Sequence, residues 1–351
     1  IIIIIITHGS YKMKKQIQIP KWLAAVWLFG PYSFAILVIA LFSPTVYQDL
    51  AIILFLMTEQ TFAIYISPKL NSISGGLFCS LSLFSLILLL KGLSCGAIRS
   101  MITMELVMNG GFRYIHLLSN EKIRARDFTN KLAFVTIFSD IEGASYVDAL
   151  TAWKEGYKII KGVIVAVVIA IGTWFTLAYV DLSTLFGTVE ILPRTFFGAL
   201  LIYSCLTIID AVYRGSLLCV QPMSILCESA MDAPYFAKSF AEFWGKKWDR
   251  PMQTILYHGA YKPCKIYCGL SNAAAVFVTF LVSGGIHTLG VAACGWVSTE
   301  SCAMMMSFFV VQAFFVLIEG WFQRQNIWLT QGLCWMSSFL FVLPFLELLK
   351  L

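Results

Sequence analysis

The sequence predicts an all-α, polytopic membrane protein with about eight or nine transmembrane or re-entrant helices and additional interfacial amphipathic helices. Composition is the first reason, because 59% of the 351 residues are hydrophobic and only 13% are charged, whereas about a quarter of the residues of a soluble domain are charged. Long uncharged runs are the second reason, and the longest covers the 34 residues from Ile266 to Thr299. A net charge of +6 is too small to indicate a nucleic-acid partner.

The hydrophobic runs divide the chain into four regions. Residues 1–21 are an N-terminal tail, whose six isoleucines at 1–6 we exclude from the fold argument. Residues 22–90 hold the first transmembrane segments, 91–161 form a cytosolic or interfacial region, and 162–351 form the main membrane core. The expected membrane segments are Trp22–Gln48, Leu50–Pro68, Leu70–Leu90, Gly162–Val180, Thr195–Tyr213, a helix within Ile266–Thr299, Ser301–Ile318 and Ile327–Leu346.

Lysine and arginine residues set the expected orientation. They are frequent in 91–161 and 214–265 and scarce in the loop 181–194, so the first two regions are predicted on the cytosolic side. The basic N-terminus also favours the cytosol, yet three simple spans before Lys91 would place the next region on the opposite face. Either a short membrane segment at Leu93–Met108 adds a crossing, or one early segment is re-entrant.

Cysteines do not indicate a disulfide framework or a metal site. The ten cysteines lie mostly in apolar runs and form no paired CxxC motif, which is typical of small buried side chains. The sequence therefore predicts no bound metal.

A stretch of aromatic and basic residues precedes the longest uncharged run. Between Asp232 and Pro251, aromatic residues recur at helical spacing opposite a polar stripe, which predicts one amphipathic helix at the membrane surface. Asp232 is the expected N-cap, Pro234 lies in the first turn, and Pro251 marks the end. By itself this helix is more simply explained as a membrane anchor.

His287 is an ionisable residue inside an otherwise apolar run. Such a residue is costly in the bilayer and by default faces a cavity or a partner, so it is a candidate functional residue. Asp249 lies 38 residues earlier, with one apolar run between them. A carboxylate at the membrane face and a histidine within the membrane could therefore face one cavity. The two glycines after Ser283 are more simply explained by close helix packing.

The motifs Phe243-Trp-Gly-Lys-Lys-Trp-Asp249 and Ser283-Gly-Gly-Ile-His287 resemble those of the wax synthase branch of the membrane-bound O-acyltransferase (MBOAT) family. That family has Phe-Trp-Gly-Arg-Arg-Trp-Asn followed, about one span later, by Ser-Gly-x-x-His with the catalytic histidine. Three positions depart from the pattern: Asp249 replaces the usual Asn or His, Lys246 and Lys247 replace two arginines, and Thr288 stands where plant members often have Glu.

The resemblance implies acyl transfer from acyl-CoA, as co-substrate, to a hydroxyl. Long-chain alcohols are the first expected acceptors, giving wax esters, and sterol or terpenoid alcohols are alternatives. His287 is then the expected general base, and Asp249 would orient the acceptor hydroxyl or the pantetheine arm. No separate cofactor is expected. Residues 162–351 would be the catalytic core, its chamber would open to the cytosol, and the endoplasmic reticulum would be the compartment.

Further substrate contacts follow from the same resemblance, each with a simpler alternative. Lys246, Lys247 and Arg250 are placed to attract the phosphates of coenzyme A, although lipid headgroups would suit them equally. Trp244 and Trp248 would line the acyl tunnel or anchor the helix. Ser283 would lie near the thioester. Membrane lipids are the other expected partners, and the sequence assigns no oligomeric state.

Two other classes of function stay open. One is a catalytically silent MBOAT-like subunit, which stays possible because Asp249 departs from the family's pattern. The other is a multi-pass transporter, with Glu59, Asp210, Glu319 and His287 as intramembrane polar sites. Transporters are commonly built from two related halves, and the absence of an internal repeat counts against transport.

Overall fold

Four long helices dominate the part of the chain that the computed structural model describes, namely residues 45, 47–54, 99, 103, 107, 144–187, 190–219, 224–293 and 298–323. They are α8 (Ala149–Tyr179), α10 (Ile191–Leu218), α14 (Asn272–Ala293) and α15 (Thr299–Gln323). All four are long and apolar enough to cross a membrane, and each coincides with a predicted span. The protein is therefore an integral membrane protein. The described residues exclude Glu59, all of Leu70–Leu90 and Ile327–Leu346, and most of Trp22–Gln48, Leu50–Pro68 and Leu93–Met108.

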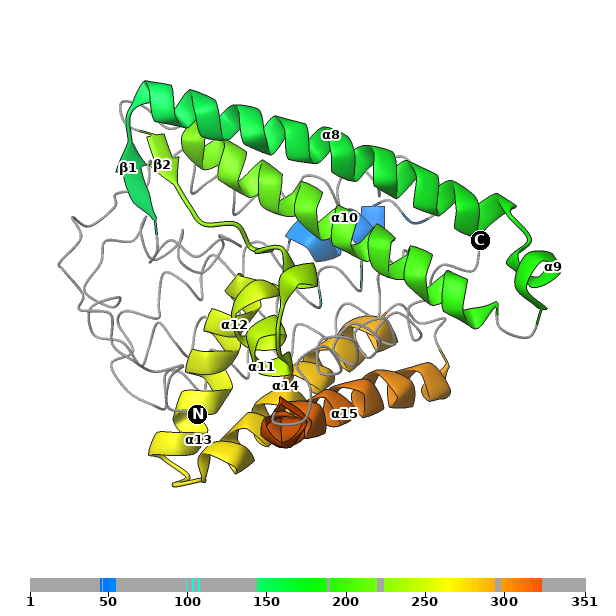
Figure 1. Ribbon diagram of the computed structural model, residues 1–351, viewed down its shortest axis with the longest axis vertical. Helices are drawn as coiled ribbons and strands as arrows, with labels where there is room; N and C mark the ends of the chain where they lie inside the picture. The colour runs from blue at the N-terminus through cyan, green and yellow to red at the C-terminus, as the bar shows by residue number, and fades with distance from the viewer. Residues whose placement is uncertain are drawn as a thin grey trace.

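Helices α8 and α10 form an antiparallel pair joined by the short helix α9 (Leu182–Phe186), as Figure 1 shows. Ile159 of α8 packs against Ala211 and Leu218 of α10. The start of α8 is fixed by Asp148, whose carboxylate accepts the N–H of Thr151 at 2.7 Å. This hydrogen bond lowers the pKa of the Asp148 carboxyl. Helix α8 passes without a break through residue 161, the expected boundary of the membrane core.

A two-stranded ribbon lies beside the start of α8. Strand β1 (Ser145–Val147) pairs antiparallel with β2 (Ser224–Leu226), and Ser145 lies opposite Leu226. The ribbon connects the residue before α8 to the segment that follows α10 (Figure 1). Within the described residues, the expectation of an all-α fold is corrected at this ribbon alone, because a three-residue ladder between distant segments leaves no periodic pattern in the sequence.

Helices α14 and α15 form the second pair and pack closely at Gly284. A Cβ atom added at Gly284 would lie 3.0 Å from Met306 Sδ and 3.0 Å from Phe309 Cβ, whereas one added at Gly285 would have no described atom within 4 Å. Gly284 therefore lets the two helices approach, as small residues do in membrane helix pairs. This supports the packing explanation for the first glycine alone.

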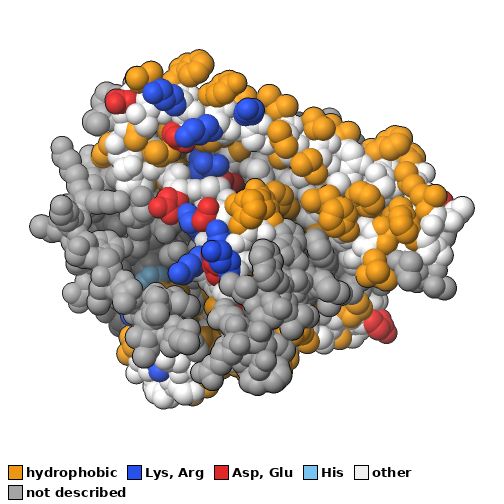
Figure 2. Space-filling model, in the orientation of Figure 1, with side chains coloured by type: hydrophobic (Ala, Val, Ile, Leu, Met, Phe, Trp, Pro, Cys, Tyr) orange, Lys and Arg blue, Asp and Glu red, His pale blue; other side chains and the backbone are white. Residues whose placement is uncertain are grey.

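Charged side chains gather near one end of the α8–α10 pair. In Figure 2 they gather in a band across one face, near the start of α8, while the described surface along α8 and α10 beyond the band is mainly apolar. The ion pair Lys158–Glu155 lies near the start of α8, and the pair Arg250–Glu228 lies in the segment 224–271. These charged side chains lie near the start of α8, whereas the α9 loop lies at the opposite end of the α8–α10 pair (Figure 1); the cytosolic placement of the charged regions stays a prediction.

Candidate active site

The segment from Asp232 to Pro251 is broken into short pieces, so the prediction of one continuous helix is wrong. It contains a 3₁₀ turn, η7 (Pro234–Phe236), then α11 (Phe240–Glu242) and a π-helical turn, η8 (Phe243–Lys247). A separate helix, α12 (Arg250–Leu256), follows. Ala233 and Asp249 have positive φ angles of 44° and 46°, which no α-helix accommodates. Pro251 accordingly begins α12 instead of ending a longer helix.

Helix α11 is held at its first turn by side chains from two directions. The Ser239 hydroxyl accepts the N–H of Glu242 at 2.9 Å, and the Glu242 carboxylate accepts the N–H of Lys238 at 2.8 Å. From α15, the Glu319 carboxylate accepts the N–H of Ala241 at 3.0 Å. Glu319, considered above as a polar site of a transporter, therefore attaches the aromatic segment to α15.

The aromatic side chains of this segment insert between the helices. The ring of Phe240 stacks on Phe315 of α15, with centroids 4.8 Å apart. Trp244 reaches further along α15, where its Nε1–H donates to Oε1 of the fully buried Gln312 at 3.0 Å. The Trp244 ring also lies 6.2 Å from Phe280 of α14. The segment thus forms part of the membrane core and is not a surface anchor. The ring of Trp248 stacks on Phe243, with centroids 5.5 Å apart.

His287 lies on α14 with its ring oriented by the helix backbone. Its Nδ1 atom is 2.8 Å from the carbonyl oxygen of Ser283. Because a carbonyl can only accept, Nδ1 carries the proton, and the neutral ring keeps its lone pair on Nε2. The imidazole also lies against Phe309 of α15, with centroids 4.7 Å apart. Ser283, expected as a substrate contact, here positions the histidine through its main chain.

The two motifs meet through shared neighbours. Phe309 contacts both Trp244 and His287, with ring centroids 6.4 Å and 4.7 Å away. On a second side, Ile286 packs in one cluster with Met252 and Ile255 of α12. The structure therefore brings the aromatic segment and the histidine helix into one packed unit; that Asp249 and His287 face one cavity stays a prediction.

Asp249 occupies a position with two conformational requirements. Its φ of 46° and ψ of 62° place it in the left-handed region, and its carboxylate accepts the N–H of Met252 at 3.3 Å as the N-cap of α12. Asp and Asn both tolerate this conformation and both cap helices. The departure from the family's usual Asn is thus compatible with the same backbone. Through α12, Asp249 supports the helix that packs against Ile286.

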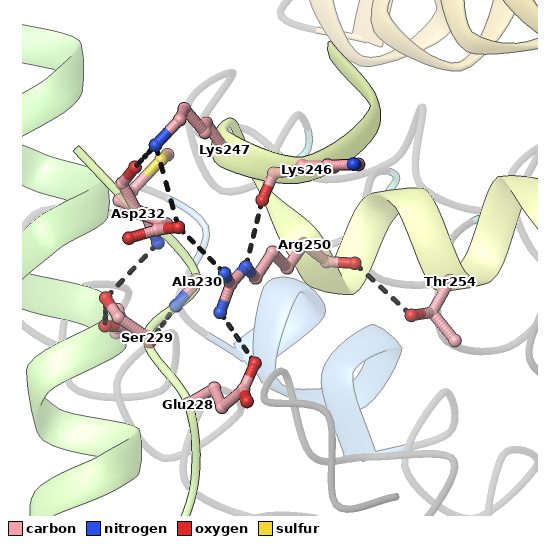
Figure 3. Close-up of polar contacts among 10 residues, drawn as sticks. Glu228, Ser229, Ala230, Asp232, Lys246, Lys247, Arg250 and Thr254 are labelled. Atoms are coloured by element: carbon pink, nitrogen blue, oxygen red, sulfur yellow. Dashed lines mark hydrogen bonds and ion pairs between the residues drawn. The ribbon is translucent and has the colours of Figure 1, made fainter. Parts of the chain in front are cut away.

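The three predicted phosphate-binding cations differ in how far they are already engaged (Figure 3). Arg250 donates to Glu228 at 2.7 Å, to Asp232 at 2.9 Å and to the carbonyl of Lys246 at 3.0 Å. Lys247 lies 3.9 Å from the Asp232 carboxylate. Among the residues that the structure describes, the exposed ammonium of Lys246 has no carboxylate partner. Lys246 is therefore the cation of this group best placed to meet a ligand.

A buried carboxylate on α10 anchors the loop that precedes these three cations. Asp210 is 1% exposed and binds Arg214 at 2.8 Å, the Ser229 hydroxyl at 3.0 Å and the N–H of Ala230 at 3.1 Å. The N–H of Arg250 in turn donates to the Ala230 carbonyl at 3.0 Å. Asp210, the second polar site of the transporter interpretation, is thus an anchor for the loop before the aromatic segment.

Comparison with known proteins places the same region in a family. Residues 227–311 match the sequence profile of the membrane bound O-acyl transferase family. The predicted resemblance to this family, in its wax synthase-like branch, is confirmed. A probable long-chain-alcohol O-fatty-acyltransferase 9 of Arabidopsis thaliana is 33% identical over 86 residues, which are 22% of this chain and 25% of the relative. An acyl-CoA–sterol O-acyltransferase 1 of the same plant is 30% identical over 126 residues, 34% of this chain and 35% of the relative. The matches thus span about a quarter to a third of the length of these two relatives.

Sequence reasoning missed two residues that shape the segment matched by the family profile. Gln312 was not singled out, although it is the one amide side chain in the run Ser301–Ile318, and such a buried polar group requires a partner. Phe309 is likewise not among the expected site residues. Its contact with both motifs depends on the pairing of α14 with α15, which no local pattern reveals.

Proposed function

We propose that this protein is an acyl-CoA-dependent O-acyltransferase that esterifies a lipid alcohol, with His287 as the general base. The observation that carries the proposal is the hydrogen bond from His287 Nδ1 to the Ser283 carbonyl at 2.8 Å. This bond selects the tautomer whose Nε2 accepts a proton, and it does so inside an apolar helix pair that suits a lipid substrate. The match of residues 227–311 to the family supports the same chemistry.

The reaction proceeds by direct attack of the alcohol on the thioester. As the alcohol oxygen bonds to the acyl carbon, its proton passes to Nε2 of His287. The carbon–sulfur bond then breaks, and coenzyme A leaves as a thiolate. The imidazolium gives its Nε2 proton to this thiolate, which restores the neutral imidazole. Products are the ester and free coenzyme A. The fixed Nδ1–H···O bond stabilises the imidazolium formed in between, because that proton remains shared with the carbonyl.

The remaining residues have supporting parts in this proposal. Trp244 and Phe309 line the apolar side of the histidine, where an acyl or alkyl chain would lie. Lys246 attracts the phosphates of coenzyme A from the aqueous side. Asp249 is a positioning residue that acts through α12. A long-chain alcohol is the proposed acceptor, with sterol or terpenoid alcohols as alternatives, no metal or cofactor takes part, and the endoplasmic reticulum is the proposed compartment.

The test is ester formation from labelled acyl-CoA in membranes that contain the protein, with and without added fatty alcohol or sterol. Wild type should form an ester with one of these acceptors, and His287→Ala should lose at least about 100-fold of the rate. His258→Ala is the matched control. His258 lies in η9 (Tyr257–Tyr261) and not on the helix of the proposed base, so this variant should keep wild-type activity. If wild type forms no ester, or His287→Ala equals it at the same protein level, the catalytic proposal is wrong.

A further inference from the structure

The ring of Phe309 covers one face of the His287 imidazole. The two ring centroids are 4.7 Å apart, and the ring planes differ by 34°. Two such rings lying side by side in one plane could not bring their centroids closer than about 6 Å, because their nearest atoms would already touch at about 3.5 Å. The two rings therefore overlap in an offset stack, which is a preferred arrangement of aromatic pairs.

The packing around Phe309 holds its ring in this position. Phe309 is 2% exposed and belongs to one buried cluster with Val291, Met305 and Phe308. Its Cβ lies so close to α14 that a Cβ added at Gly284 would be only 3.0 Å away. Close packing of this kind keeps a side chain in one rotamer. The stack on His287 is therefore formed before any substrate binds, and no rearrangement is needed during a reaction.

A stacked aromatic pair is by itself explained by packing. Phe315 of the same helix stacks on Phe240 in a similar way, with centroids 4.8 Å apart and planes 11° apart. The pair at His287 differs because one of its rings takes up a proton. In the proposed reaction, the alcohol proton passes to Nε2 of His287 while the alcohol oxygen bonds to the acyl carbon. The imidazole thus becomes a cation directly against the face of Phe309.

This positive charge requires stabilisation inside an apolar helix pair. In a Ser-His-Asp triad a carboxylate faces Nδ1 of the histidine, whereas Nδ1 of His287 donates to the neutral carbonyl of Ser283 at 2.8 Å. The face of a benzene ring is negative, and it attracts a cation within about 6 Å, most strongly where water is excluded. A neutral imidazole is not attracted in this way. The contact therefore strengthens as the proton arrives, and an interaction of this kind raises kcat.

We propose that Phe309 stabilises the imidazolium form of His287 through a cation–π contact and thereby accelerates acyl transfer. The inference rests on the proposed function and adds a residue to its mechanism. Phe309 is a positioning residue, because it acts through His287. Its electron-rich face, and not only its bulk, is what the reaction uses. An apolar side chain of similar size would fill the same space but would leave the imidazolium without this stabilisation.

The test replaces Phe309 by phenylalanine analogues that carry one, two or three ring fluorines. Fluorine is little larger than hydrogen, so the packing is kept, but it withdraws electrons and weakens the negative face of the ring. The rate of ester formation is measured in a single turnover with acyl-CoA and the alcohol both saturating, so that substrate affinity does not enter. We expect the logarithm of the rate to fall in proportion to the number of fluorines, by about ten-fold for three.

Phe315 provides the matched control on the same helix. The same analogues at 315 change a stack on Phe240, whose ring never becomes charged, and should leave the rate unchanged. Phe309→Leu keeps an apolar side chain without an aromatic face and should be as slow as the analogue with three fluorines. Each fluorinated protein in detergent should unfold at the wild-type temperature, because the ring volume changes little. A loss of rate at 309 then reports the charge on His287 and not a loss of fold.

The outcomes separate this inference from the proposed function. If wild type forms ester, His287→Ala does not, and the rate is the same for all analogues at 309, the role of Phe309 is wrong and the proposed function is retained. An equal decline at 315 would also overturn it, since the effect would then be one of general packing. If Phe309→Leu is slow but three fluorines have no effect, the ring acts by bulk alone. If wild type forms no ester, no imidazolium arises, and both proposals fail together.

Discussion

Replacing Gly284 by alanine tests the close packing of α14 on α15, with Gly285→Ala as a matched control in the next position. The new Cβ at 284 would lie 3.0 Å from Phe309 Cβ, whereas carbon atoms normally pack at about 3.5–4.0 Å. Phe309 Cβ is attached directly to the backbone and cannot rotate away, so α15 must shift by several tenths of an ångström. At 285 the same Cβ meets no described atom within 4 Å.

The two variants share their change in helix propensity, so the difference between them isolates packing. Overpacking of this kind costs about 1–3 kcal/mol, and we expect Gly284→Ala to be less stable than Gly285→Ala by that amount. The measurement is the temperature at which detergent-solubilised, fluorescently tagged protein loses its monodisperse peak. Equal unfolding temperatures for the two variants would refute the argument that Gly284 sets the helix separation.

Three further predictions address the aromatic segment and its ends. Gln312→Leu leaves the buried Trp244 Nε1–H without its acceptor and should cost about 1–3 kcal/mol, but much less in a Trp244→Phe background; equal losses in both backgrounds, measured by thermal unfolding, would contradict the hydrogen bond. Asp249→Asn should keep wild-type stability, while Asp249→Ala loses the cap and should cost about 1 kcal/mol or more; thermal unfolding that ranks them equally would be evidence against the cap. A maleimide should label the exposed Cys268 faster than Cys264, because burial raises the pKa of the Cys264 thiol and keeps it protonated to higher pH; similar labelling rates between pH 7 and 9 would contradict this ordering.

Local properties of the sequence account for what was predicted correctly. A run without charge is read directly from consecutive residues, so each of α10, α14 and α15 coincides with a predicted span, although the helix ends differ from the predicted ones by several residues. His287 was identified for the same reason, as an ionisable residue in such a run. Its Nδ1 partner, the carbonyl of Ser283, lies one turn away on the same helix.

Long-range contacts account for what was not predicted. The aromatic residues after Asp232 do follow a helical period, but the backbone leaves the helical region at Ala233 and Asp249. The N–H of Asp232, just before Ala233, donates to the carbonyl of Lys247, two residues before Asp249, at 2.9 Å, a contact across 15 residues. The segment therefore folds back on itself, and the periodic residues meet α15 in separate pieces. Patterning alone cannot distinguish this arrangement from one continuous helix.

Helix α8 is too long to fit within the hydrocarbon layer of a membrane. Its 31 residues extend about 46 Å, and the hydrocarbon layer is about 30 Å thick. Containing the whole helix would require a tilt of about 50°, beyond the roughly 40° that membrane helices reach. The first turns of α8 must therefore project from the bilayer and carry the β1–β2 ribbon with them. The stacked rings of Trp153 and Tyr157 lie on this projecting part. The first turns of α8 therefore hold the ribbon outside the lipid bilayer.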